Sequence, residues 1–128
     1  MMAPTLDEDT IAALRELADD DDPDFLDDLI EMYIQDTGAS LQNVAAMSSG
    51  LGPDRDALRR IAHTLKGASR NIGALRLAEH CSALERSADT AAHHQISATV
   101  GRMRGEFEQV KSSLTAATSK NRRPDSPC

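Results

Sequence analysis

Apolar residues recur at intervals of three and four along most of the chain, and this spacing constrains the fold more than any other feature. It continues without a break from Leu26 to Met47 and again from Ile96 to Leu114. Such spacing places apolar side chains on one side of an α-helix. No stretch alternates with a period of two residues, which is the pattern of a half-buried strand. The sequence therefore predicts an all-α protein.

Start and stop signals divide this pattern into five helices. Thr5 and Glu8 have the spacing of a capping box, and Asp22-Pro23 predicts a capped helix start. Pro53, after two glycines, predicts another proline-initiated start. The predicted helices span residues 5–18, 23–48, 53–72, 74–88 and 93–114. Four long amphipathic helices with short turns predict an antiparallel up-down four-helix bundle with a short extra N-terminal helix.

Length and composition limit the remaining possibilities. The 128 residues suit one domain, which we place at residues 1–117, followed by a polar tail at 118–128 that we expect to be disordered. Aromatic residues make up 2% of the chain, so the core must be aliphatic. No apolar run approaches the roughly 20 residues that span a bilayer. The first ten residues, MMAPTLDEDT, lack the basic and apolar regions of a signal peptide. Two cysteines are too few for a disulfide framework, which favours a cytoplasmic location.

The charge of the chain is unevenly distributed. The formal net charge is −7, but residues 1–36 hold 13 acidic residues and one basic residue. Residues 37–128 hold 8 acidic and 13 basic residues. The basic residues are spread over several helices, and the acidic segment repels phosphates, so nucleic-acid binding is not expected.

The helix predicted over residues 53–72 has an unusual polar side. With successive residues about 100° apart, His63 lies roughly 160° from the apolar centre. Arg59 and Arg70 share its stripe, and Lys66 and Gly67 flank it one turn later. These five residues are called the His63 face below. The pattern predicts an exposed imidazole among cations, beside a residue without a side chain.

The residues of the His63 face suit phosphoryl transfer. A neutral imidazole is a competent nucleophile near pH 7. Transfer of a phosphoryl group needs positive charge near its oxygens, which Lys66 can supply. Glycine costs roughly 1 kcal/mol relative to alanine inside a helix, so Gly67 indicates a demand for access to the imidazole. The alternative is that His63 is an ordinary solvated histidine on a basic helix surface, and spacing alone leaves both readings open.

Two other kinds of site are less well supported. A metal site made from His80, Cys81, His93 and His94 is disfavoured, because His80 and Cys81 point about 100° apart and the other two fall at a turn. Cys81 lies in an apolar stripe without a charged activator, so it is not expected to be a catalytic nucleophile.

The segment from Ala62 to Ser69, AHTLKGAS, followed by Ile72-Gly73-Ala74, resembles the signature of histidine-containing phosphotransfer domains, called HPt domains. The most specific part of the resemblance covers residues 58–85, including Leu77, Cys81 and Leu84-Glu85. A less distinctive part runs upstream through Phe25-Leu26, Tyr33 and Leu41.

The resemblance implies a role for each of several residues. His63 would be the phosphoryl acceptor, Lys66 would stabilise the phosphoryl group, and Gly67 would admit the partner. Gly73 would allow tight contact between the third and fourth helices. Arg59, Arg60 and Arg70 lie outside the family pattern, and partner contact is the role expected of them.

The resemblance also implies the partners. A receiver domain of a response regulator or hybrid kinase would pass a phosphoryl group from its aspartate to His63, and another receiver would remove it. The expected protein is a monomeric carrier rather than an enzyme, with no cofactor of its own and with Mg²⁺ held by the receiver. A non-phosphorylated adaptor that binds or sequesters receivers is the alternative. The upstream kinase and the downstream regulator are not identified by the sequence.

Overall fold

We describe the protein from a computed structural model, which covers residues 5–17, 24–48 and 54–117. All regular secondary structure in these ranges is helical, in agreement with the predicted fold class. The helices are α1 (Glu8–Leu17), α2 (Phe25–Ser48), α3 (Arg55–Ile72), α4 (Leu75–Ser87) and α5 (His93–Ala117). The predicted tail at residues 118–128 and the predicted starts at Asp22-Pro23 and Pro53 lie outside the described residues.

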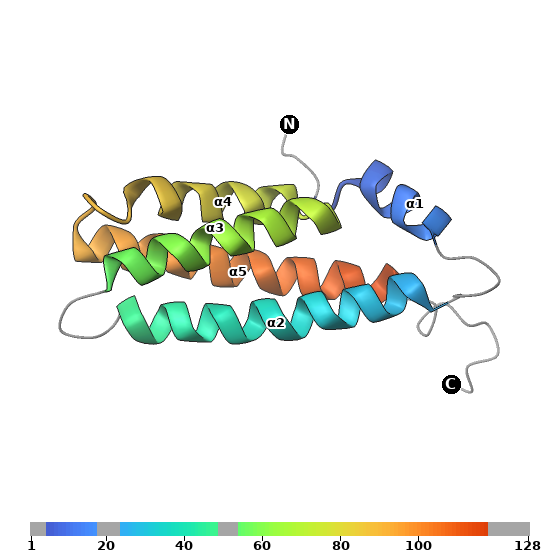
Figure 1. Cartoon of the computed structure of the whole chain (residues 1–128), viewed down its shortest axis with the longest axis horizontal. Helices are drawn as coiled ribbons and strands as arrows, with labels where there is room; N and C mark the ends of the chain where they lie inside the picture. The colour runs from blue at the N-terminus through green and yellow to red at the C-terminus, as the bar shows by residue number, and fades with distance from the viewer. Residues whose placement is uncertain (1–4, 18–23, 49–53, 118–128) are drawn as a thin grey trace.

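Helices α2 to α5 lie side by side along the long axis of the molecule, and successive helices run in opposite directions (Figure 1). Each contacts two neighbours: α3 packs on α4, α4 on α5, α5 on α2 and α2 on α3. Helix α1 lies at one end, where it contacts α2 and α3.

One aliphatic core runs between the long helices, as the composition requires. Most apolar residues on the inner faces are buried, and Val44, Leu58, Cys81 and Met103 are fully enclosed. Burial of each such side chain contributes about 1.5–3 kcal/mol. Others, such as Leu29, Met47 and Ile61, are partly buried against this core. Met32 of α2 is an apolar residue outside the core, because its side chain is 55% exposed. No described helix is long and apolar enough to cross a membrane.

The helix starts differ in detail from those predicted. Asp7, rather than the Thr5–Glu8 capping box, precedes α1, and its carboxylate accepts a hydrogen bond of 2.5 Å from the Thr10 hydroxyl. Asp54 caps α3, because its side chain accepts a hydrogen bond from the Ala57 amide. Aspartate is a good N-cap at position 54 because its oxygen satisfies a backbone amide that the helix leaves unpaired.

Gly73 ends α3 in the left-handed region, with φ of 88°. A side chain at this position would approach Thr10 Cβ to 3.1 Å and the Asp7 carbonyl oxygen to 3.3 Å. The Asp7 amide also donates a 2.8 Å hydrogen bond to the Gly73 carbonyl. The atoms nearest to an added Cβ at Gly73 therefore belong to α1 and to Asp7 before it. Tight contact between the third and fourth helices, the role expected of Gly73, stays a prediction.

We expect Gly73→Ala to lower the free energy of unfolding by about 1–2 kcal/mol, because a left-handed residue with a Cβ is strained and Thr10 must also move. Gly101→Ala is the matched control, since Gly101 lies inside α5 with open space around it and should gain about 0.5–1 kcal/mol. Urea unfolding followed by circular dichroism measures both. Equal effects of the two substitutions would contradict this account of Gly73.

Candidate functional site

His63 lies near the middle of α3 with its side chain pointing to solvent, as predicted. The side chain is 68% exposed. The core holds the opposite side of the helix through Leu58, Ala62 and Leu65, all of which are buried. The strong amphipathic pattern of α3 therefore fixes which residue faces outward, and a protein partner can reach the imidazole.

A carboxylate from the neighbouring helix binds both His63 and Lys66. Nδ1 of His63 lies 2.8 Å from Oε2 of Glu85, and Nζ of Lys66 lies 2.5 Å from Oε1 of the same carboxylate. The side chains of Lys66 and Glu85 are only 19% and 22% exposed. The tight packing of α3 against α4 brings these three groups together.

The protonation of Glu85 sets the form of the imidazole. The Lys66 ammonium, followed by the His63 ring, lowers the pKa of Glu85, so the carboxylate is ionised at neutral pH. An ionised carboxylate only accepts hydrogen bonds, so Nδ1 of His63 must be the donor. In the neutral ring this leaves the lone pair on Nε2. The geometry thus prepares Nε2 as the nucleophile.

The three arginines predicted to contact a partner differ in their surroundings. Arg59 lies 3.0 Å from Asp56 and 3.1 Å from Asp89, so two carboxylates already neutralise it. Arg60 and Arg70 are exposed and form no ion pair within the described ranges. The His63 face is therefore less cationic than predicted, because α4 and its following turn place Glu85 and Asp89 beside it.

Gly67 follows His63 by one helical turn and leaves the surface open. A Cβ at this position would have no neighbour within 4 Å. Packing inside this molecule therefore gives no reason for a glycine in the middle of α3. Glycine is costly in a helix interior, and access for a partner stays the prediction for Gly67.

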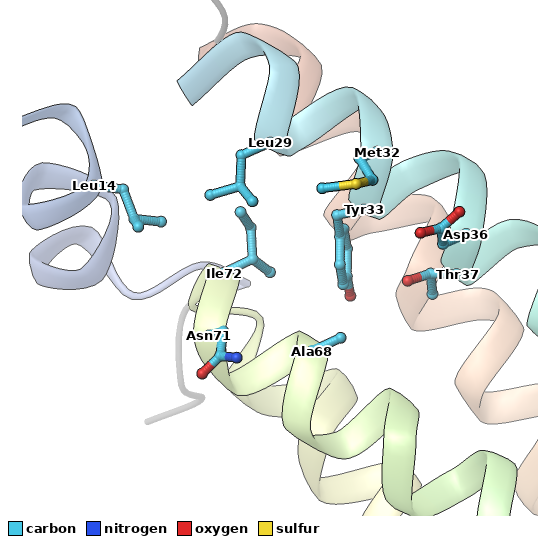
Figure 2. Close-up of a pocket in the computed structure, with 9 residues that line it drawn as sticks. All are labelled: Leu14, Leu29, Met32, Tyr33, Asp36, Thr37, Ala68, Asn71 and Ile72. Atoms are coloured by element: carbon cyan, nitrogen blue, oxygen red, sulfur yellow. The ribbon is translucent and has the colours of Figure 1, made fainter. Parts of the chain in front are cut away.

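A shallow apolar groove lies beside the exposed side of α3. It is formed mainly by α2 and α3, and Leu14 of α1 closes one end (Figure 2). In Figure 2, Leu14, Leu29 and Ile72 point toward one another, and the ring of Tyr33 forms the wall beyond them. Its lining residues are Leu14, Leu29, Met32, Tyr33, Asp36, Thr37, Ala68, Asn71 and Ile72.

The groove meets the His63 face along α3. Asn71 follows Gly67 by one turn, so His63, Gly67 and Asn71 form one stripe that leads to the edge of the groove. Tyr33 and Ser69 support the base of the groove, since their hydroxyl oxygens lie 2.8 Å apart. The buried Ser69 on the apolar side of α3 is explained by this hydrogen bond.

The alternative sites fit the structure poorly. Burial raises the pKa of the Cys81 thiol to about 12, which keeps it protonated and unreactive. Nε2 of His93 contacts the Ser48 carbonyl at the end of α2, which is a structural role. The described residues contain no group of three or more histidine, cysteine or acidic side chains placed to hold a metal ion.

Glu85 is the site residue for which sequence reasoning assigned no role. It lies within the stretch that resembles the HPt signature, but it is 22 positions after His63 on another helix. A helical-wheel projection orders residues on one helix and cannot show contacts between two. Glu106 of α5 is a buried acid that was not anticipated, and it pairs with Arg76 of α4 at 3.0 Å.

The chain is similar in sequence and in structure to histidine-containing phosphotransfer proteins. The model of the Hpt domain family matches residues 28–117. The crystal structure of histidine-containing phosphotransfer protein B from Pseudomonas aeruginosa is 33% identical, with a TM-score of 0.75, over 89% of this chain and 94% of that chain. The maize histidine-containing phosphotransfer protein is 20% identical with a TM-score of 0.80, over 88% and 81% of the two chains, and shows the same fold.

A curated rice relative, from Oryza sativa subsp. japonica, is named pseudo histidine-containing phosphotransfer protein 2. It is 25% identical over 79% of this chain and 67% of its own length. The family match covers most of the present chain, including all of α3 and α4. Together with the match to the Pseudomonas protein, it shows that this chain belongs to the Hpt domain family and serves in histidine phosphotransfer.

Proposed function

We propose that the protein accepts a phosphoryl group from a receiver-domain aspartate on Nε2 of His63 and passes it to another receiver. The observation that carries this proposal is the hydrogen bond from Nδ1 of the exposed His63 ring to the ionised Glu85. That bond leaves the Nε2 lone pair directed away from the carboxylate and available to a partner.

The chemistry is a reversible exchange of two bonds. The Nε2 lone pair attacks phosphorus of the aspartyl phosphate, and the N–P bond forms as the P–O bond to aspartate breaks. The electron pair of the broken bond leaves on the aspartate carboxylate. Donation to the second receiver reverses these changes. Lys66, held one turn away by Glu85, supplies a cation for the phosphoryl oxygens.

The docking surface that we propose combines three features. Gly67 leaves room above the His63 face, Arg60 and Arg70 provide unpaired positive charge, and the groove beside them provides apolar area. Receiver domains carry an acidic pocket around their aspartate, and unpaired arginines favour encounter with such a surface. Arg59 has a smaller part here than in the sequence prediction, because Asp56 and Asp89 already bind it.

The finer features of the fold and the chemistry belong to the same proposal. The cyclic order of contacts among α2, α5, α4 and α3 supports an antiparallel up-down four-helix bundle, with α1 as the short extra helix. We place the domain at residues 1–117. The Mg²⁺ ion and most of the catalytic groups belong to the receiver, so the protein acts as a monomeric carrier without a cofactor of its own. A cytoplasmic location stays a prediction from the cysteine content.

The second candidate function is that of a non-phosphorylated adaptor that binds receivers. It is considered because the rice relative is named a pseudo histidine-containing phosphotransfer protein. In this chain, position 63 is a histidine whose Nε2 is prepared for attack. A protein that only bound receivers would not need that geometry.

The test is incubation of the chain with receiver domains of its source organism that have been phosphorylated with labelled acetyl phosphate. We expect label on this chain that is lost in acid and retained in base, as is characteristic of phosphohistidine. Stable binding to a receiver without any such label would support the adaptor instead.

A further inference from the structure

Three large apolar side chains are exposed among the described residues, and two of them lie at the groove between α2 and α3. Met32 lines the groove and is 55% exposed, and Leu17 follows the lining residue Leu14 by one turn of α1. Exposed apolar side chains that gather in one place indicate an interaction surface. The groove has a volume of about 250 Å³. A cavity of about 150 Å³ can hold a benzene ring, so one or two apolar side chains of a partner fit here.

The α2 edge of the groove carries unpaired negative charge. Asp28 and Asp36 lie one helical turn before and one turn after Met32, and all three side chains are exposed. Neither carboxylate forms an ion pair or a side-chain hydrogen bond within the described residues. Figure 2 shows Met32 and Asp36 on the α2 side of the groove and Asn71 on the α3 side. An apolar partner residue in this groove would therefore have two free carboxylates beside it.

The charge changes sign from α3 to α2. Helix α3 carries the exposed cations Arg60 and Arg70. Helix α2 begins in the acidic part of the chain, since residues 1–36 hold 13 acidic residues and one basic residue, Arg15. Arg15 donates a hydrogen bond to the Ala117 carbonyl at the end of α5. The phosphoryl chemistry of the His63 face uses the cations of α3 but gives no reason for the acids of α2.

We propose that the groove receives an apolar side chain from a segment of the receiver that also carries lysine or arginine, and that Asp28 and Asp36 pair with those cations. This inference rests on the proposed function. The acidic pocket of the receiver has to face His63 for transfer. Further acidic surface over α2 would be repelled there, whereas basic surface would be attracted.

Opposite charges at two ends of one contact also determine the orientation of the partner. A receiver docked in reverse would bring its acidic pocket to Asp28 and Asp36 and its basic segment to Arg60 and Arg70. Both ends would then set like charges together, which disfavours the wrong arrangement. Asp28 and Asp36 are therefore specificity-determining residues that do not touch the phosphoryl group.

A second copy of this chain is a poorer occupant of the groove. Two copies related by a twofold axis bring the same surface of each copy together. The α2 edges would then meet, with Asp28 and Asp36 on both sides of the contact, and like charges repel. The charge of the groove edge thus favours a basic partner over self-association.

The concentration dependence of phosphotransfer separates docking from chemistry. Initial rates would be measured by rapid quenching, with increasing concentrations of a phosphorylated receiver that labels the wild-type chain. For Asp36→Lys in about 50 mM salt, we expect the receiver concentration at half-maximal rate to rise about fivefold, and for Asp28→Lys/Asp36→Lys more than about tenfold. The maximal rate should stay within about twofold of the wild type. In about 0.5 M salt the effect of Asp36→Lys should fall to about twofold or less.

The apolar part of the contact is tested by Met32→Gln. This variant should raise the half-maximal concentration about fivefold in both low and high salt, because it removes apolar contact and no charge. Leu75→Gln is its matched control, since Leu75 is 43% exposed at the start of α4, outside the groove. We expect Leu75→Gln to follow the wild type.

Glu79→Lys is the matched control for Asp36→Lys. It makes the same change of net charge at an exposed residue of α4 that forms no ion pair within the part of the chain that the structure describes. It should leave the half-maximal concentration within about twofold of the wild type. Circular dichroism would show that each variant is folded. When the exposed lysines and arginines of the receiver are changed singly to glutamate, one such receiver should dock poorly on the wild type and normally on Asp36→Lys.

Equal half-maximal concentrations for Asp36→Lys and Glu79→Lys would overturn the inference, while continued transfer would leave the proposed function intact. A dimer of this chain in sedimentation, lost in Met32→Gln, would assign the groove to a second copy and would also overturn it. Failure of the wild type to accept a phosphoryl group from any receiver would contradict the proposed function, and this inference with it.

Discussion

Replacement of His63 by glutamine should abolish acceptance of a phosphoryl group from any receiver. The amide has no nucleophilic nitrogen comparable with the imidazole lone pair, so the expected loss is at least about a thousandfold, as when a nucleophile is removed from an active site. The side chain is 68% exposed and is not part of the hydrophobic core of the described residues, so the fold should be retained. Transfer of label from a phosphorylated receiver measures the loss.

The control for this variant is its stability. Urea unfolding of His63→Gln should agree with that of the wild type within about 0.5 kcal/mol, which is typical of surface substitutions. His94→Gln provides a second control, because His94 is exposed at the start of α5 and has no part in the proposed site. His63→Gln that unfolds would show a structural role for His63, and His63→Gln that still accepts label would place the acceptor elsewhere.

Gly67→Glu should block transfer without disturbing the fold. A Cβ at this position has no neighbour within 4 Å, so the added side chain leaves the helix into the space that we assign to the receiver. Its bulk and its negative charge both oppose an acidic partner surface, and we expect transfer to fall by about a hundredfold or more. Rapid-quench transfer kinetics at several receiver concentrations would measure the effect.

Two further variants make this result specific. Gly101→Glu introduces the same side chain at another exposed glycine inside a helix, but on α5, and should transfer at the wild-type rate. Gly67→Ala adds only a methyl group and should have a small effect. Undiminished transfer by Gly67→Glu would mean that the partner does not dock over this face.

Much of the fold could be predicted from the sequence because it depends on patterns within single helices. The periodicity of apolar residues located all five helices and the inner face of each, and an exposed His63 followed from the same pattern. Boundaries were less certain. Asp7 precedes α1, where Thr5 was expected to mark the start, since several residues near a helix start can satisfy its free amides.

The sequence predicted the residues of the candidate site that lie on α3. It did not predict Glu85, which comes from α4. Lys66 and Gly67 follow from their spacing to His63, but Glu85 meets them only once α3 and α4 are packed. The same packing sets Asp89 against Arg59 and thereby removes a cation that the helical wheel left free. The contact of Gly73 with Asp7 and Thr10 was missed for a related reason, since these residues belong to α1 and the segment before it.

The location of the phosphoryl group within the phosphorylated chain tests the central claim most directly. The protein would be labelled with ¹⁵N at its histidine rings, phosphorylated by a receiver, and observed by two-dimensional NMR that correlates ring nitrogens with ring protons. We expect phosphorus bonded to Nε2 of His63, with the proton retained on Nδ1 beside Glu85. Phosphorus on Nδ1, or on any residue other than His63, would contradict the account.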